Sequence, residues 1–123
     1  MPTDPAPVTI ARAVHRAVVV VDPEGDQGLE DLLVRFEDAD EPLGSDGAAR
    51  VAQRIAEAAG ALDPQAEDPA VQLAAAVATY LAYRRDEVDE DPRALLELAA
   101  RAEFDDHPPD RVRELLAERG VSL

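Results

Sequence analysis

Carboxylates are the most abundant side chains in this sequence that could do chemistry, and they are concentrated in two segments. The chain has 27 acidic residues against 12 basic ones, which gives a formal net charge of -15. Residues 22–46 contain ten carboxylates and a single arginine, and residues 86–91 contain five carboxylates and no basic residue. Because concentrated like charge accelerates association with a surface of opposite charge, this placement favours binding to a basic protein surface.

We therefore expect a non-enzymatic interaction module of the inhibitor, immunity or adaptor type. Its two acidic segments should lie next to each other in the folded protein and form one docking surface for a protein partner with a basic surface. Such binding should weaken as the salt concentration rises. The carboxylates expected to contact the partner come from both segments: Asp38, Asp40, Glu41, Asp86, Glu87, Asp89 and Glu90.

These carboxylates are not expected to catalyse a reaction. General acid–base catalysis needs a carboxyl group with a raised pKa in a buried site, whereas runs of acidic residues are typical of solvated surface. Of the two serines, Ser45 is better explained as a helix cap, and Ser122 lies near the end of the chain. All 12 basic residues are arginine, which excludes chemistry on lysine and indicates a bacterial genome rich in G and C. No catalytic residue is therefore assigned.

Neither histidine lies in a pattern typical of a metal site. His15 has apolar residues four positions away on both sides, and His107 has only Glu103 before it at helical spacing. Alternating carboxylates from residue 22 onward resemble the start of a calcium-binding loop, but its sixth position is Gln27 instead of glycine and its twelfth is Leu33 instead of glutamate. The chain also lacks cysteine. We expect no metal and no other cofactor.

Two alternatives to the interaction module remain open. A small helical enzyme or ligand-binding protein would use a site near Tyr80, Tyr83 and a histidine, although alanine-rich packing leaves little volume for a pocket. Alternatively, the acidity serves only solubility or adaptation to high salt, and carboxylates should then cover every exposed face. The segments 9–21, 48–62 and 92–104 are near neutral or slightly basic, which favours the interaction module.

Other partners are not expected. The arginines are dispersed and some have a carboxylate at helical spacing, as in Asp31 with Arg35 and Glu97 with Arg101, so nucleic-acid binding is disfavoured. No stretch approaches the roughly 18 apolar residues of a membrane span, and the first residues lack the basic region of a secretory signal, so we expect a cytoplasmic protein without membrane binding. The Ala-rich segment 70–85 could pack within one chain or against a second copy, which leaves a homo-oligomer possible.

The apolar spacing predicts an all-α fold, a compact bundle of about five to six short helices with a central Ala-rich helix. At 123 residues the chain suits one domain. We expect a flexible N-terminal segment over residues 1–8, which contain three prolines, and a single helical domain over residues 9–123. The expected helices cover residues 9–21, about 26–36, about 45–60, 70–85, 92–104 and about 111–120.

Local signals set the expected ends of these helices. The four valines at 18–21 favour a strand, yet no second strand is evident, so we interpret them as the end of the first helix. The Asp-Pro pairs at 68–69 and 91–92 are typical of helix starts. Gly60 and Gly120 are suited to the left-handed residue that ends a helix.

Overall fold

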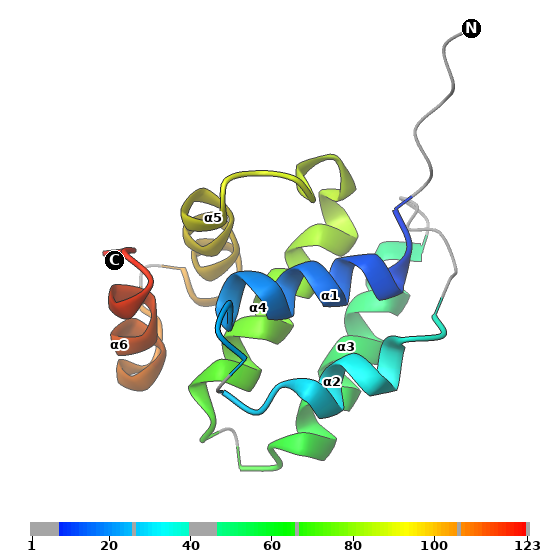
Figure 1. Ribbon diagram of the computed structural model, residues 1–123, viewed down its shortest axis with the longest axis horizontal. Coiled ribbons are helices and arrows are strands. Elements are labelled where there is room, and N and C mark those ends of the chain that lie inside the picture. Colours follow the sequence, from blue (N-terminus) through cyan, green and yellow to red (C-terminus); the bar gives the residue numbers. More distant parts are fainter. Residues whose placement is uncertain (1–7, 26, 40–46, 66, 106, 123) are drawn as a thin grey trace, which may run out of the picture.

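Helix α4 (Pro69–Tyr83) lies at the centre of the computed structural model, and α1, α3, α5 and α6 pack directly against it (Figure 1). Nine of its 15 residues are buried. A helix that is apolar on nearly every side must be surrounded by other elements, because only a narrow strip of it can face water. The prediction of an all-α bundle around a central Ala-rich helix is therefore confirmed.

The structure describes residues 8–25, 27–39, 47–65, 67–105 and 107–122. Within these ranges the elements in chain order are α1 (Ile10–Val21), α2 (Glu30–Phe36), α3 (Ala48–Leu62), α4, the single 3-10 turn η2 (Arg85–Glu87), α5 (Pro92–Phe104) and α6 (Asp110–Glu118). The valines at 18–21 belong to α1, as expected, and no strand is found in the described ranges. Val8, which we assigned to the flexible N-terminal segment, packs partly against the core.

The Asp-Pro pairs start helices as predicted. The Asp68 carboxylate accepts hydrogen bonds from the backbone N–H groups of Ala70 and Val71 at 3.0 and 3.4 Å. The Asp91 carboxylate accepts one from the N–H of Ala94 at 3.2 Å. Each aspartate satisfies N–H groups that have no partner within the first helical turn.

Two expected helix ends are wrong, since α4 ends at Tyr83 instead of residue 85 and α3 does not end at Gly60. α3 continues through Gly60 to Leu62, and its C-terminal cap is Asp63. The Asp63 carboxylate accepts hydrogen bonds from the N–H groups of Glu67 and Asp68, both at 2.9 Å, so an aspartate stabilises this connection and no left-handed glycine is needed. At the end of α6, by contrast, Gly120 has the expected positive φ of 85°. Ser45, the expected cap of the third helix, lies outside the described residues.

The second helix begins later than expected. α2 starts at Glu30, because Gly28 has a φ of 74°, which interrupts any helix starting near residue 26. Asp22 caps the end of α1 instead of starting the next helix. Its buried carboxylate accepts a hydrogen bond from the N–H of Gln27 at 2.9 Å, which holds the turn after α1.

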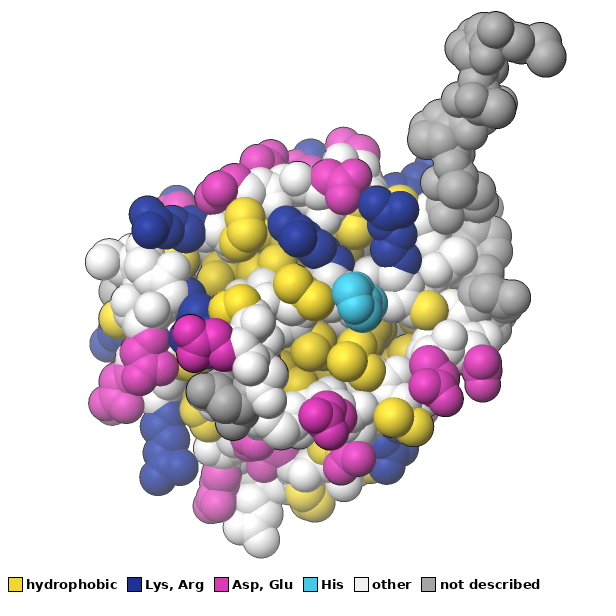
Figure 2. All heavy atoms as spheres, viewed as in Figure 1, with side chains coloured by type: hydrophobic (Ala, Val, Ile, Leu, Met, Phe, Trp, Pro, Cys, Tyr) yellow, Lys and Arg dark blue, Asp and Glu magenta, His cyan; other side chains and the backbone are white. Residues whose placement is uncertain are grey.

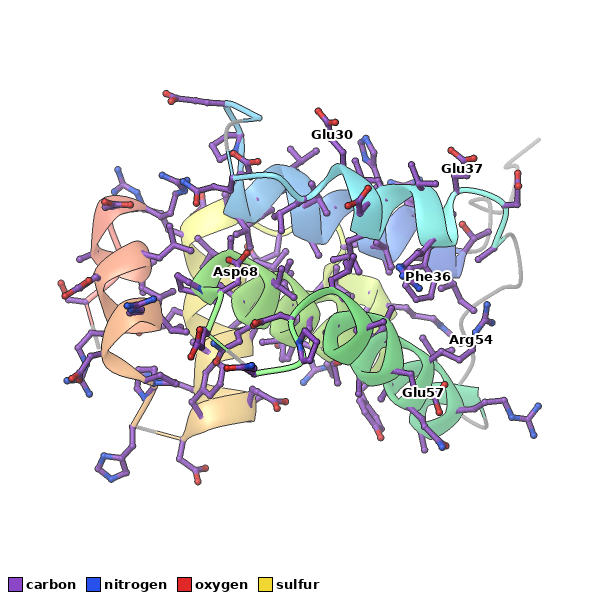
Figure 3. All side chains as sticks on the ribbon, turned by 90° about the horizontal axis from the view of Figure 1, so that it is seen from below. Glu30, Phe36, Glu37, Arg54, Glu57 and Asp68 are labelled. Atoms are coloured by element: carbon purple, nitrogen blue, oxygen red, sulfur yellow. The ribbon has the colours of Figure 1, made fainter. Side chains whose placement is uncertain are left out.

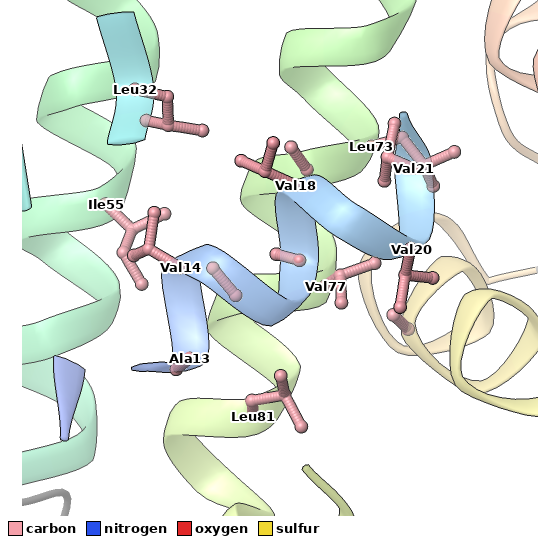
Figure 4. Close-up of a cluster of buried hydrophobic side chains, with 14 of the residues drawn as sticks. Ala13, Val14, Val18, Val20, Val21, Leu32, Ile55, Leu73, Val77 and Leu81 are labelled. Atoms are coloured by element: carbon pink, nitrogen blue, oxygen red, sulfur yellow. The ribbon is translucent and has the colours of Figure 1, made fainter. Parts of the chain in front are cut away.

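One contiguous cluster of buried side chains draws on all six α-helices. Figure 4 shows part of it, where α1 faces α4 and reaches toward α2 and α3. On α4, alanines recur every fourth residue at positions 70, 74, 78 and 82, and none is more than 4% exposed. Small side chains in such a row let neighbouring helices approach closely. The labelled core residues are Ala13, Val14, Val18, Val20, Val21, Leu32, Ile55, Leu73, Val77 and Leu81.

The alanine row makes a prediction about stability. Replacing Ala78, which is fully buried, with leucine should lower the free energy of unfolding by about 1–3 kcal/mol, because the larger side chain must push the surrounding helices apart. Urea unfolding measures the change. The matched control is Ala102→Leu on the exposed side of α5, which should alter the free energy by less than about 0.5 kcal/mol. Equal losses in the two variants would contradict close packing around α4.

Candidate functional site

Those predicted contact carboxylates that the structure describes do not form one surface. α2 lies on one side of α1, and the turn that contains η2 and residues 88–91 lies on the other (Figure 1). Basic and histidine side chains over α1 separate the two groups of acidic side chains (Figure 2). Among the described residues, the start of the first segment comes near the end of the second, since Pro23 lines the same pocket as Pro92, which directly follows the second segment. The expectation that the contact residues adjoin is therefore wrong for those that the structure describes.

Arginines of the same chain hold much of the second acidic segment. Arg12 on α1 forms an ion pair with Asp89, with 3.2 Å between Nη2 and Oδ1. Arg84, which follows α4, binds Glu87 at 2.9 Å and lies 3.8 Å from Asp86. Apart from Glu87, the side chains in these pairs are largely exposed, and such pairs contribute little to stability. They nevertheless reduce the negative charge that this segment presents to a partner.

The backbone and neighbouring side chains hold the rest of this segment. The carbonyl of Glu90 accepts a hydrogen bond from Arg16 at 2.9 Å, and its carboxylate accepts one from the N–H of Asp91 at 2.9 Å. Glu87 is only 19% exposed, and its second carboxylate oxygen accepts a hydrogen bond from the Tyr80 hydroxyl. Partial burial and the Glu87 hydrogen bond together raise the pKa of Tyr80 to about 12. Residues 86–91 therefore form an internally bonded corner of the fold.

Unlike residues 86–91, the outward face of α2 has carboxylates with no arginine partner among the described residues. Figure 3 shows Glu30 and Glu37 projecting to the same side, away from the body of the protein. Asp31 and Asp38 are exposed as well, and the structure places no arginine or histidine nitrogen of the described residues within 4 Å of these four carboxylates. The expected ion pair with Asp31 does not form, whereas the expected pair of Glu97 with Arg101 does, at 3.0 Å.

At the centre of this face lies Val34, which is 61% exposed. The residues on either side of it at helical spacing are Glu30, Asp31, Glu37 and Asp38, which together with Val34 we call the α2 acidic face. Of the predicted contact residues only Asp38 belongs to it. Asp40 and Glu41 lie outside the described residues.

The alternative site near the tyrosines is only partly formed. Tyr80 and Tyr83 line an open groove of about 350 Å³ between α4 and α5, together with Arg84 and Glu103. No histidine lines it, because His15 is exposed on α1 and His107 follows α5. The expected combination of the tyrosines with a histidine is therefore wrong.

Sequence reasoning missed a different cluster. Arg16, Arg93 and Arg119 line one apolar pocket of about 320 Å³ near the end of α1. They come from α1, α5 and the end of α6, so no pattern in the sequence groups them. One signal was present, because neither Arg16 nor Arg119 has an acidic residue three or four positions away that could pair with it on a helix.

Comparisons with known proteins do not assign a function to this chain. No family model, curated protein or solved structure matches it. None of the described helices has the length and hydrophobicity to cross a bilayer. Across the described ranges, no three or more histidine, aspartate or glutamate side chains are grouped so as to hold a metal ion.

The Tyr80–Glu87 contact predicts a pH dependence. In the folded protein the pKa of Tyr80 is about 12, against an ordinary tyrosine value of 10.0. The contact therefore stabilises the fold fully below pH 10, and this contribution is lost as the pH rises toward 12. Between pH 9.5 and 11, urea unfolding should show a larger loss of stability for the wild-type protein than for Tyr80→Phe. Absorbance at 295 nm should show that Glu87→Gln lowers the pKa of Tyr80. An unchanged tyrosine titration in Glu87→Gln would contradict the contact.

Proposed function

We propose that the protein is a non-enzymatic interaction module that binds a basic protein surface through the α2 acidic face. The observation that carries this proposal is the pattern of four exposed carboxylates around the exposed Val34, with no arginine of the described residues paired to them. Protein interfaces commonly combine an apolar centre with a polar rim. Here the rim is uniformly negative, which selects for a partner carrying arginine or lysine around an apolar hollow.

The position of the charges on α2 supports a role outside the fold. Glu30 and Asp31 lie in the first turn, where carboxylates stabilise a helix through its dipole. Glu37 and Asp38 lie just beyond its C-terminal end, where negative charge opposes the dipole. Carboxylates that do not stabilise their own helix, and that pair with nothing in the described fold, remain available to a partner.

The uneven distribution of charge argues against acidity that serves solubility alone. α1 contains two arginines, one histidine and no acidic residue, and α3 contains two arginines and a single glutamate. A surface adapted only for solubility or high salt would carry carboxylates on these helices too. The negative charge is instead local, as expected for steering toward one partner.

Neutralising the α2 acidic face tests the proposal. The variant Glu30→Gln, Asp31→Asn, Glu37→Gln, Asp38→Asn should capture its basic partner from a lysate of the source cells about tenfold less efficiently than wild type, since each exposed pair contributes a few tenths of a kcal/mol. Quantitative mass spectrometry of the captured proteins at 50 and 300 mM salt measures the change. Capture by the wild-type protein should fall with salt.

The matched control removes the same charge elsewhere. It carries Glu67→Gln, Glu103→Gln, Glu114→Gln and Glu118→Gln, all at exposed positions outside α2. Capture by this control should stay close to wild type, and circular dichroism should show both variants folded. Equal losses in the two variants would mean that only net charge matters. Absence of any basic protein whose capture depends on α2 would overturn the proposal.

A further inference from the structure

Three arginines converge on a pocket of about 320 Å³ where the end of α1, the start of α5 and the end of α6 meet. Arg16, Arg93 and Arg119 line it together with the apolar side chains of Val19, Val20 and Leu96. Figure 2 shows hydrophobic side chains bordered by basic ones on this face, over α1 and α5. The pocket is a concentration of positive charge in a chain whose net charge is -15.

The described carboxylates do not neutralise these three guanidinium groups. None of their oxygens lies within 4 Å of Arg16, Arg93 or Arg119. Arg16 donates from Nη2 to the Glu90 carbonyl, but its Nε is buried and has no hydrogen-bond partner. A buried N–H group without an acceptor is costly, and most such groups in proteins have a partner.

The fold also holds Arg119 in place, and Arg93 lies nearby. Arg119 donates from Nε to the Val21 carbonyl at 2.7 Å, which fixes its guanidinium beside the end of α1. Arg93 lies over Gly120, where a Cβ atom would come within 2.9 Å of the Arg93 Nε. Gly120 is needed for its positive φ, whereas the exposed and flexible side chain of Arg93 can move away from a Cβ atom at this position. Guanidinium groups held in advance lose little freedom when they bind an anion.

We propose that this pocket binds a small organic anion in which a carboxylate or phosphate group is joined to an apolar body. The guanidinium groups provide charge-assisted hydrogen bonds to the anionic group, and Val19, Val20 and Leu96 provide the apolar walls. The volume lies at the lower end of the range of about 300–1,000 Å³ that is typical of small-molecule sites. A long polyanion is disfavoured, because Glu24 and Asp91 adjoin the two prolines that line the pocket and would repel it.

Titration with defined probes tests the proposal on the whole chain. Benzoate and phenyl phosphate carry the two anionic groups on the same ring, benzyl alcohol has the ring without the charge, and inorganic phosphate has the charge without the ring. We expect at least one aromatic anion to bind saturably by calorimetry, about tenfold or more tightly than benzyl alcohol and inorganic phosphate. The stronger of the two aromatic anions identifies the anionic group. Amide NMR shifts should concentrate at residues 19, 20 and 96.

Two substitutions at the pocket and one elsewhere keep the test specific. Arg93→Gln should weaken binding about tenfold, since no ion pair of the fold uses this guanidinium, and Val19→Glu should weaken it similarly by placing a negative charge at the pocket. Arg50→Gln, an exposed arginine on α3, should change affinity by less than about twofold. Unchanged urea midpoints would show that the variants are folded.

Several results would overturn the proposal. The proposal is wrong if neither aromatic anion binds saturably at 10 mM, or if the NMR shifts concentrate away from α1 and α5. It is also wrong if Arg50→Gln and Arg93→Gln weaken binding equally. The test is independent of the α2 acidic face, because variants of that face leave all three arginines in place. Failure at one site therefore says nothing about the other.

Discussion

The rest of the structure depends on the burial of α4 on almost every side. Its apolar surface can be removed from water only if several helices surround it, and α1, α3, α5 and α6 do so. The alanine row at 70, 74, 78 and 82 keeps these helices close, and the larger side chains Leu73, Val77 and Leu81 fill the space facing α1 (Figure 4). The packing of α4 thus fixes the position of α1.

The position of α1 determines which carboxylates bond within the fold and which remain exposed. α1 has no acidic residue, and it lies between α2 and the turn after α4. Its arginines bond to that turn, Arg12 through the Asp89 carboxylate and Arg16 through the Glu90 carbonyl. One acidic segment is therefore held by the fold, and the α2 acidic face is left facing solvent.

The same arrangement produces a positive pocket in a negative protein. Arg16 faces Arg93 and Arg119 across the end of α1 because α5 and α6 pack against the same central helix as α1 does. The two candidate surfaces differ in kind. The α2 acidic face presents carboxylates around an exposed valine, which favours our proposal of a basic protein partner. The arginine pocket has apolar walls, which favours our proposal of a small anion.

The sequence by itself determined most of the secondary structure, because the signals are local. Apolar spacing predicted the helices, the aspartates before Pro69 and Pro92 predicted two helix starts, and the largely apolar character of residues 70–85 predicted the central helix. Gly60 was misread because the cap at Asp63 depends on N–H groups of the next connection. Only the tertiary structure decided which charges are neighbours. Arg12 forms an ion pair with Asp89, and Arg16 lines the same pocket as Arg119. These residues are too far apart in the sequence for helical spacing to predict that they are neighbours. The separation of the acidic segments and the arginine pocket both follow from helix packing.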